Sequence, residues 1–269
     1  MSQDTITAKA FADSWNNLPE GSVYSANQFI DWFEPLTKLD IEGKSVLELG
    51  CGNGSLLTHM TNWNPSKLHG VDLGDSVKSC KTNMEQMNFS NYEVIQGDLT
   101  TFEGSDLYDI TYCIGVLHHL KEPYNGFQSV LNNTKSGGKF HCWVYAYEGN
   151  AVIRYIVDPI RKIASLLPWW ANKFLIATPL SFIYFIYAHI IIGLHLKFAP
   201  LYEYSKWICQ RGYLFFRHVA FDQLVTPQTV YIKKSTIEEW LSDKEKIVQG
   251  STYIIFRNGN SWKFGGIKK

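Results

Sequence analysis

A short apolar run in Lys44–Leu57, KSVLELGCGNGSLL, passes the acidic residue Glu48 and leads into Gly50, Gly52 and Gly54. Glycines in such a turn let the backbone double back from a strand to a helix and let a ligand lie directly on the main chain. The spacing is GxGxG, whereas a dinucleotide-binding turn reads GxGxxG and places a pyrophosphate on the helix N-terminus. A carboxylate beside the turn favours a positively charged ligand. The pattern therefore predicts a binding site for a cation that carries no phosphate.

The segment Val46–Gly54 resembles the first motif of the class I S-adenosylmethionine-dependent methyltransferases. The resemblance implies an enzyme that binds S-adenosylmethionine as methyl donor and releases S-adenosylhomocysteine. In that family an acidic residue after the second strand holds the ribose hydroxyls, and Asp72 matches it about 20 residues downstream. Asp98 matches the acidic residue that contacts the adenine amine. The other cofactor contacts implied are Glu48, Gly50, Cys51, Gly52, Gly54, Ser55, Leu73, Leu99, Ile114 and Gly115.

Methyl transfer is an in-line displacement at the methyl carbon, so positioning of the acceptor supplies most of the acceleration. A hydroxyl acceptor also gains from a base within hydrogen-bond reach, for which histidine is suited. His118 and His119 follow the predicted fourth strand in YDITYCIGVLHHL, and each is a candidate catalytic base. The alternative is that the pair packs or positions the loop. The predicted function is methyl transfer to an oxygen or nitrogen of a small metabolite; an NAD(P)-dependent reductase and a non-catalytic cofactor-binding scaffold stay open.

Other polar residues are weaker candidates for the acceptor site. His141, Tyr145 and Tyr147 lie on or after the predicted fifth strand, where alternation sends some side chains toward the pocket mouth and others into packing. The sequences WVYAYEGN and FDQLVTP are similar to those of a subgroup of bacterial methyltransferases with a long cap.

That similarity makes Arg154, Asp222 and Arg257 candidate substrate contacts, although each is equally well explained as a surface charge or as a contact between cap and core.

Near the N-terminus, Tyr24 and Trp15 precede the first core strand. An aromatic ring facing a sulfonium is favourable by about 0.5 to 2 kcal/mol. Tyr24 is therefore predicted to lie beside the cofactor, with Trp15 a weaker candidate and ordinary packing the alternative for both.

The elements that position these residues alternate between strand and helix. Strands are predicted at 45–49, 68–72, 93–96, 109–114 and 139–147, with Gly137 and Gly138 as the turn before the last, and helices at 25–36, 55–61, 75–87, 124–134 and 236–241. The alternation predicts an α/β fold with a doubly wound, mostly parallel sheet. Residues after 247 read as a hairpin, and the resemblance implies that it completes a seven-stranded sheet with an antiparallel strand. The predicted organisation is a Rossmann-like core with N-terminal cover helices (1–148), a helical cap insertion (149–230) and a final helix and hairpin (231–269).

The predicted cap is apolar and aromatic, with no formal charge between Lys173 and Lys197. Pro179–Leu196 would extend about 27 Å as a helix, close to the length that crosses a bilayer. A buried cap helix packed on the sheet and its neighbours is favoured, because polar residues are interspersed and a span would separate the final hairpin from its sheet. A lipid-facing cap that admits a hydrophobic substrate and a true span are the alternatives. A homodimer through this apolar surface also stays open.

Composition limits the partners. The 269 residues carry 25 basic and 25 acidic side chains, and a zero formal charge argues against nucleic acid. An odd number of cysteines without a CxxC pair supports neither a disulfide framework nor a metal site. The N-terminal residues have no apolar core of the kind a secretory signal needs. The expected location is the cytoplasm, with membrane association through the cap as the alternative.

Overall fold

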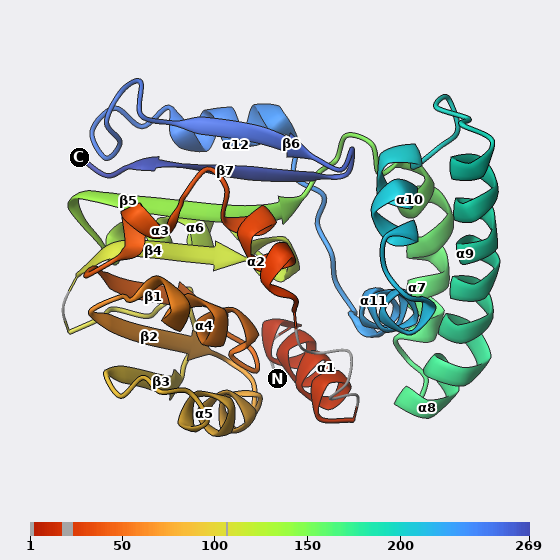
Figure 1. The fold of residues 1–269 in the computed structure, drawn as a ribbon, viewed down its shortest axis with the longest axis horizontal. Coiled ribbons are helices and arrows are strands. Elements are labelled where there is room, and N and C mark those ends of the chain that lie inside the picture. The colour runs from red at the N-terminus through yellow and green to blue at the C-terminus, as the bar shows by residue number, and fades with distance from the viewer. Residues whose placement is uncertain (1–2, 18–23, 106) are drawn as a thin grey trace.

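The computed structural model describes residues 3–17, 24–105 and 107–269, and a seven-stranded sheet forms its centre (Figure 1). The strands are β1 (Ser45–Leu49), β2 (Lys67–Asp72), β3 (Tyr92–Gln96), β4 (Tyr108–Ile114), β5 (Thr134–Tyr145), β6 (Tyr253–Arg257) and β7 (Ser261–Ile267). Their order is β3-β2-β1-β4-β5-β7-β6; β7 is antiparallel to both neighbours and the other pairs are parallel. The predicted fold class is confirmed.

Helices cover both faces of the sheet. They are α2 (Ala26–Phe33), α3 (Lys38–Ile41), α4 (Ser55–Met60), α5 (Val77–Glu85), α6 (Pro123–Asn132) and α12 (Lys234–Leu241), with short 3-10 turns η2 (Thr61–Trp63) and η3 (Leu117–His119). One core cluster packs α2, α4 and α5 on the sheet through residues such as Phe33, Leu57 and Met84. The other packs α6 and α12 through Phe127 and Trp240. Because both faces of the parallel strands are buried, these strands read as continuous apolar runs.

The fifth strand begins earlier than predicted. Thr134 pairs with Tyr108, and the next paired residue of β5 is Lys139, opposite Ile110. Gly137, at φ +76°, lies inside this irregular stretch of β5. The prediction that Gly137 and its neighbour form a turn before the strand is therefore wrong: the extra residues form a bulge, which a positive φ at glycine permits.

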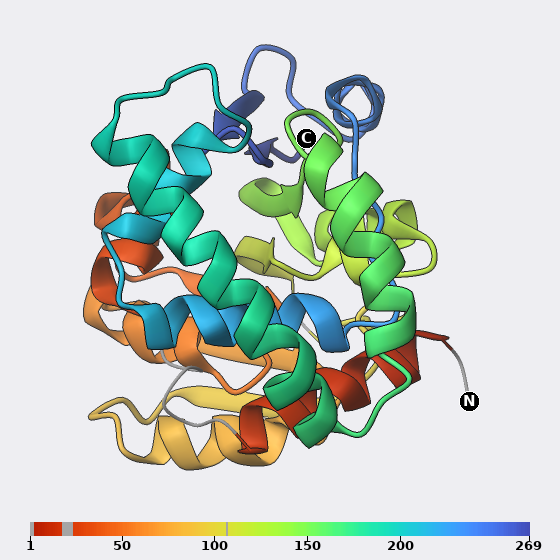
Figure 2. The ribbon, with the colours of Figure 1, turned by 90° about the vertical axis from the view of Figure 1, so that its right-hand side faces the viewer.

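The cap consists of helices stacked at one end of the sheet (Figures 1 and 2). They are η4 (Ile153–Val157), α7 (Asp158–Ala164), α8 (Trp169–Ala171), η5 (Asn172–Ala177), α9 (Thr178–Gly193), α10 (Tyr202–Cys209) and α11 (Tyr213–Val225). In both views α9 is the outermost helix, and it packs on α10 and α11. The N-terminal helix α1 (Gln3–Asn17) packs on the opposite side of α11. The layers between α9 and the sheet are therefore α10, α11 and α1.

The outermost part of the cap is far more exposed than a core helix. Within the described residues, the continuous helical run Trp169–Gly193 is long and apolar enough to cross a membrane, with a mean hydropathy of 1.9. Only 22% of its most apolar stretch is buried inside the protein. The buried residues of α9 are Ser181, Ala188 and Ile191. The prediction of a buried helix packed on the sheet is wrong here, because α10 and α11 lie between α9 and the core and cover one side of it only.

Candidate active site

The glycine turn, Gly50 to Gly54, lies between β1 and α4 and is held against the end of β2. Gly50 donates its N–H to the carbonyl of Val71 at 2.7 Å. Gly50 has φ +86°, and a Cβ there would lie 2.4 Å from Cγ2 of Val116. Gly54 has φ +79°, and a Cβ there would lie 2.5 Å from Sγ of Cys80. Both positions therefore need glycine for backbone conformation and for space.

Asp72, the last residue of β2, gathers three donors on its carboxylate. Oδ2 accepts the N–H of Gly52 at 2.9 Å, and Oδ1 accepts the N–H of Gly74 at 2.8 Å and the hydroxyl of Ser76 at 3.1 Å. Burial raises the pKa of Asp72, and these hydrogen bonds oppose the shift. Each carboxylate oxygen offers two lone pairs, so Oδ2 keeps capacity for one more bond. Asp72 is thus oriented by the glycine turn while it lines the adjoining cavity.

Glu48, inside β1, is a buried carboxyl on the wall of the same cavity. Burial raises the pKa of Glu48 to about 8, and nearby Asp72 adds to this increase. The hydroxyl of Tyr112 donates to Oε2 at 2.9 Å and opposes it. At neutral pH the apo carboxyl is therefore mostly protonated. A cation bound in the cavity would favour the carboxylate and lower the pKa.

A cavity of about 220 Å³ runs from the glycine turn to the cap. The predicted cofactor contacts that line it are Tyr24, Glu48, Gly50, Cys51, Ser55, Asp72, Leu73, Asp98, Leu99, Ile114 and Gly115. Gly52 and Gly54 are not among the lining residues; they shape the turn behind it. Oδ1 of Asp98 accepts the N–H of Thr100 at 2.8 Å and its hydroxyl at 2.7 Å, which orients the carboxylate after β3.

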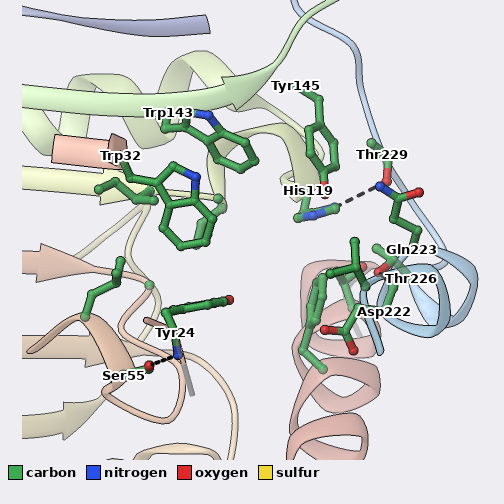
Figure 3. A pocket seen from close by; sticks show the side chains of 18 of the residues that line it. Tyr24, Trp32, Ser55, His119, Trp143, Tyr145, Asp222, Gln223, Thr226 and Thr229 are labelled. Atoms are coloured by element: carbon green, nitrogen blue, oxygen red, sulfur yellow. Dashed lines mark hydrogen bonds between the residues drawn. The ribbon is translucent and has the colours of Figure 1, made fainter. Parts of the chain in front are cut away.

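Aromatic rings form the wall above the glycine turn (Figure 3). Tyr24 meets Trp32 edge to face at 4.6 Å between ring centroids, and Trp32 lies 5.5 Å from Trp143. The N–H of Tyr24 donates to Oγ of Ser55 at 2.8 Å, which ties the chain before α2 to the start of α4. Tyr24 therefore lies in the cavity beside the glycine turn. The side chain of Trp15 lies outside the described part of the chain.

The two histidines after β4 have different surroundings. His118 is completely buried, does not line the cavity, and accepts the N–H of Tyr145 on Nδ1 at 3.4 Å. His119 lines the cavity, and its Nδ1 lies 3.0 Å from the carbonyl oxygen of Gln228. A carbonyl only accepts, so Nδ1 of His119 carries the hydrogen and Nε2 keeps a lone pair. Burial lowers the pKa of His119 to about 4 and holds the pKa of His118 well below its usual range. Of the pair, the structure brings His119 to the cavity.

The cap side of the cavity, hereafter the acceptor end, is formed by one face of α11 together with His119 and Tyr145 (Figure 3). Nε2 of His218 lies 3.1 Å from Oδ2 of Asp222, one helical turn further on. Since the carboxylate accepts, Nε2 of His218 carries the hydrogen and Nδ1, which is buried with no hydrogen-bond partner among the described residues, has the lone pair. Gln223 also lines the acceptor end. Asp222 is thus brought to the cavity, paired with a histidine that sequence reasoning missed.

Other predicted polar candidates serve different contacts. Arg154 lies outside the cavity with its guanidinium 3.5 Å from the ring centroid of Tyr147, which is itself outside the cavity, so neither is placed to touch an acceptor. His141 is buried between the hydroxyl of Tyr253, 2.6 Å from Nδ1, and the carbonyl of Trp32, 2.8 Å from Nε2. These contacts join β5 to β6 and α2.

Arg257 does line the cavity, but its Nε donates to Oδ2 of Asp31 at 2.7 Å, which ties β6 to α2. A second cavity arginine, Arg161 of α7, forms a 2.8 Å ion pair with Asp158 and donates Nε to the carbonyl of Gln223 at 2.6 Å. Both guanidinium groups are therefore already neutralised by carboxylates of the chain.

Residues 40–149 match the family model described as a methyltransferase domain. This part of the chain is therefore similar to a methyltransferase domain. The solved structure of magnesium protoporphyrin IX methyltransferase from Synechocystis PCC 6803, with bound S-adenosylhomocysteine, aligns over 100% of both chains with a TM-score of 0.57 and 14% sequence identity. At that identity the likeness shows a shared fold, and it includes the region of the cap.

Curated relatives match only part of the chain. Pavine N-methyltransferase from Thalictrum flavum subsp. glaucum is 30% identical over 115 residues, which are 41% of this chain and 30% of that protein. The tRNA U34 carboxymethyltransferase from Campylobacter hominis is 29% identical over 108 residues, which are 38% of this chain and 36% of that protein. The chain therefore spans less than half the length of the curated relatives it matches.

The span that matches a methyltransferase domain contains the glycine turn but not α11. Sequence reasoning therefore had motifs for the turn and none for the acceptor end, and it missed Trp32, His218, Gln223 and Phe11 of α1 as cavity residues. One signal was readable: His218 and Asp222 are four residues apart, which places them on one face of a helix.

Proposed function

We propose that this chain transfers the methyl group of S-adenosylmethionine to an oxygen or nitrogen of a small metabolite. The observation that carries the proposal is the continuous cavity that joins the glycine turn to the acceptor end beneath the cap. A methyl donor bound at the glycine turn and a small acceptor bound at the acceptor end would meet in that cavity. Holding both reactants in one cavity favours a direct displacement, because it keeps them in line.

The residues around the glycine turn fit this cofactor. Asp72 has spare acceptor capacity for ribose hydroxyls, Asp98 lies after the neighbouring strand for the adenine amine, and Glu48 is a buried carboxyl that a cationic ligand would stabilise. The rings of Tyr24 and Trp32 line the cavity, and the face of an aromatic ring attracts a sulfonium. When bound, S-adenosylmethionine supplies an electrophilic methyl group. The chain's own part is to fix the ligand in the turn without the phosphate contacts of a dinucleotide site.

At the acceptor end, the chain offers two imidazoles that accept protons. His119 has its Nδ1 hydrogen held by the carbonyl of Gln228, which leaves Nε2 as the acceptor. His218 has its tautomer set by Asp222, whose charge would stabilise an imidazolium. His119 can orient a hydroxyl or amine through Nε2 and take its proton as the new bond to the methyl carbon forms. His218 can do the same once the acceptor uncovers its buried Nδ1.

A small acceptor is favoured over a tRNA, although a tRNA U34 carboxymethyltransferase is similar over 38% of this chain. Nucleic-acid binding needs unpaired cationic groups facing the phosphates. Here Arg161 and Arg257 are paired with Asp158 and Asp31, and the formal charge of the chain is zero. Aromatic walls instead suit an apolar or aromatic body with one nucleophilic group.

The proposal is tested by turnover. We expect the purified chain to form S-adenosylhomocysteine from S-adenosylmethionine with members of a panel of small phenols, alcohols and amines, and to leave bulk tRNA unmethylated. Transfer to tRNA with no turnover of the panel would refute the choice of acceptor. Calorimetric binding of NADH in place of S-adenosylmethionine would identify a reductase, and cofactor binding with no turnover of any acceptor pool would identify a scaffold.

A further inference from the structure

The outer cap face is a set of exposed apolar side chains on α7, α8, η5, α9 and the loops beside them. These helices lie together at the end of the molecule away from the sheet (Figure 2). Its members are Ile163, Leu166, Trp169, Trp170, Phe174, Leu175, Phe182, Ile183, Ile186, Ile190, Leu194 and Phe198. Leu166 is 84% exposed, Ile183 64% and Phe198 87%. Monomeric soluble proteins rarely expose contiguous apolar surface on this scale, so a partner that covers the outer cap face is expected.

The opposite side of α9 is fixed to the rest of the cap. The hydroxyl of Tyr184 lies 2.9 Å from Oγ of Ser205 on α10, and Oγ of Ser181 lies 3.3 Å from the hydroxyl of Tyr213 on α11. Because α10 and α11 also line the cavity, α9 cannot cross a bilayer without being separated from the acceptor end. The arrangement suits a helix that lies along an interface.

The charges of this segment have one sign. From Pro159 to Tyr202 the chain has no acidic residue and has four basic ones, Arg161, Lys162, Lys173 and Lys197. Lys162 and Lys197 are exposed, one before and one after the apolar run. Lysines in such positions reach toward anionic head groups while neighbouring apolar side chains enter the acyl boundary. Trp169 and Trp170 add the aromatic residues that favour the membrane–water interface.

We propose that the outer cap face binds the surface of a lipid bilayer containing anionic lipids, with α9 lying in the interface. A second copy of the chain fits less well. Protein interfaces carry roughly one hydrogen bond per 100–200 Å² and a polar rim. Between Phe174 and Leu196 the chain has no charged residue, and Nδ1 of exposed His189 is 2.8 Å from the carbonyl of Phe185 in its own helix. Lipid demands no hydrogen bonds from such a surface.

The test is flotation of the intact protein with phosphatidylcholine vesicles, with and without one third phosphatidylglycerol. We expect the wild type to float with the mixed vesicles. The triple variant Leu175→Gln, Ile183→Gln and Ile190→Gln should lower the partition coefficient at least tenfold, because three exposed apolar side chains no longer enter the lipid. The variant Lys162→Gln with Lys197→Gln should lower it by about fivefold per lysine on mixed vesicles alone.

The matched control is Leu39→Gln, Leu107→Gln and Val248→Gln, which also replaces three exposed apolar residues but lies outside the cap. It should float like the wild type. The proposal is wrong if the wild type stays at the bottom with both kinds of vesicle, or if the control loses as much binding as the cap variant. It is also wrong if the wild type is a dimer on a sizing column without lipid, and the cap variant becomes a monomer but still floats like the wild type. The assay contains neither cofactor nor acceptor, so its failure and the failure of methyl transfer are separate outcomes.

Discussion

At the scale of single residues, the cofactor half of the cavity depends on carboxylates whose surroundings are unusual. Asp72 is the clearest case, since its oxygens already hold Gly52, Gly74 and Ser76 and one lone pair stays free for a ligand. Charge-assisted hydrogen bonds of this kind are about twice as strong as neutral ones. Loss of the carboxylate therefore removes a strong ligand contact and also loosens the turn.

We predict that Asp72→Ala weakens binding of S-adenosylmethionine at least tenfold in isothermal titration calorimetry. The exposed neighbour Asp75 provides the control, because Asp75→Ala removes the same group a few residues further along the chain. Its dissociation constant should match that of the wild type. Unchanged affinity in a folded Asp72→Ala variant would refute the assignment of Asp72 to the ribose.

Glu48 leads to a prediction about protons. Its folded-state pKa of about 8 means that a cationic ligand binding at pH 7 must shift the carboxyl toward its charged form and release a proton. Calorimetry at pH 7 in buffers of different ionisation enthalpy measures that release. We expect it to be lost in Glu48→Gln and kept in the exposed-site control Glu238→Gln. Equal proton release in all three proteins would mean that Glu48 does not respond to the cofactor.

The acceptor end gives a third prediction. His119→Gln should lower kcat by about 100-fold with little change in cofactor affinity, as expected for loss of a general base. The kcat of His218→Gln, measured in the same assay with the best acceptor from the panel, shows which of the two imidazoles acts as the base. A large loss in the second variant and none in the first would assign the base to the His218–Asp222 pair; full activity in both would show that neither imidazole takes the proton.

At the scale of elements, the glycine turn was readable from its sequence because its requirement is local. A positive φ and a helix start within five residues leave few alternatives to glycine. Strands β1 to β4 were likewise predicted within a residue or so, since each is a short apolar run bounded by polar turns. The bulge of β5 was not, because Gly137 looks the same in a turn and inside a strand until its pairing partner is known.

We predict that Gly54→Ala lowers the free energy of unfolding by about 2–4 kcal/mol, the sum of a positive φ and overpacking. Gly43→Ala separates the two costs, because Gly43 also has a positive φ, +71°, but nothing lies within 4 Å of the position that a Cβ would take there. It should lose only about 1 kcal/mol. Chemical denaturation measures both, and equal losses would show that contact with Cys80 costs nothing.

At the scale of the whole molecule, buried histidines couple stability to pH. Burial lowers the pKa values of His119 and His141 to about 4 and also lowers that of His118. In the unfolded chain a histidine binds its proton below a pKa of about 6.5, whereas in the folded chain His119 and His141 stay neutral down to about pH 4. Their contribution is therefore complete above that range and is lost as pH falls through it.

We predict that the free energy of unfolding in guanidinium decreases from pH 6.5 to pH 4.5, where proton uptake by the three histidines of the unfolded chain exceeds the opposing uptake by folded Glu48. His141→Gln should reduce that slope, because one of the groups that takes up protons on unfolding is gone. The exposed residue His195 is the control, and His195→Gln should leave the slope unchanged. A slope that is the same in all three proteins would show that other groups cause the acid sensitivity.

The sequence by itself determined the sheet, the glycine turn and the acidic residues around it, because apolar periodicity and turn geometry act over a few residues. It also marked the apolar cap and the pair of histidines after β4. Only the tertiary structure decided that His119 rather than His118 reaches the cavity, that Arg154 stacks on Tyr147, and that α9 exposes its apolar side. These outcomes depend on packing between segments distant in the chain, such as α11 against α1, which no local pattern records.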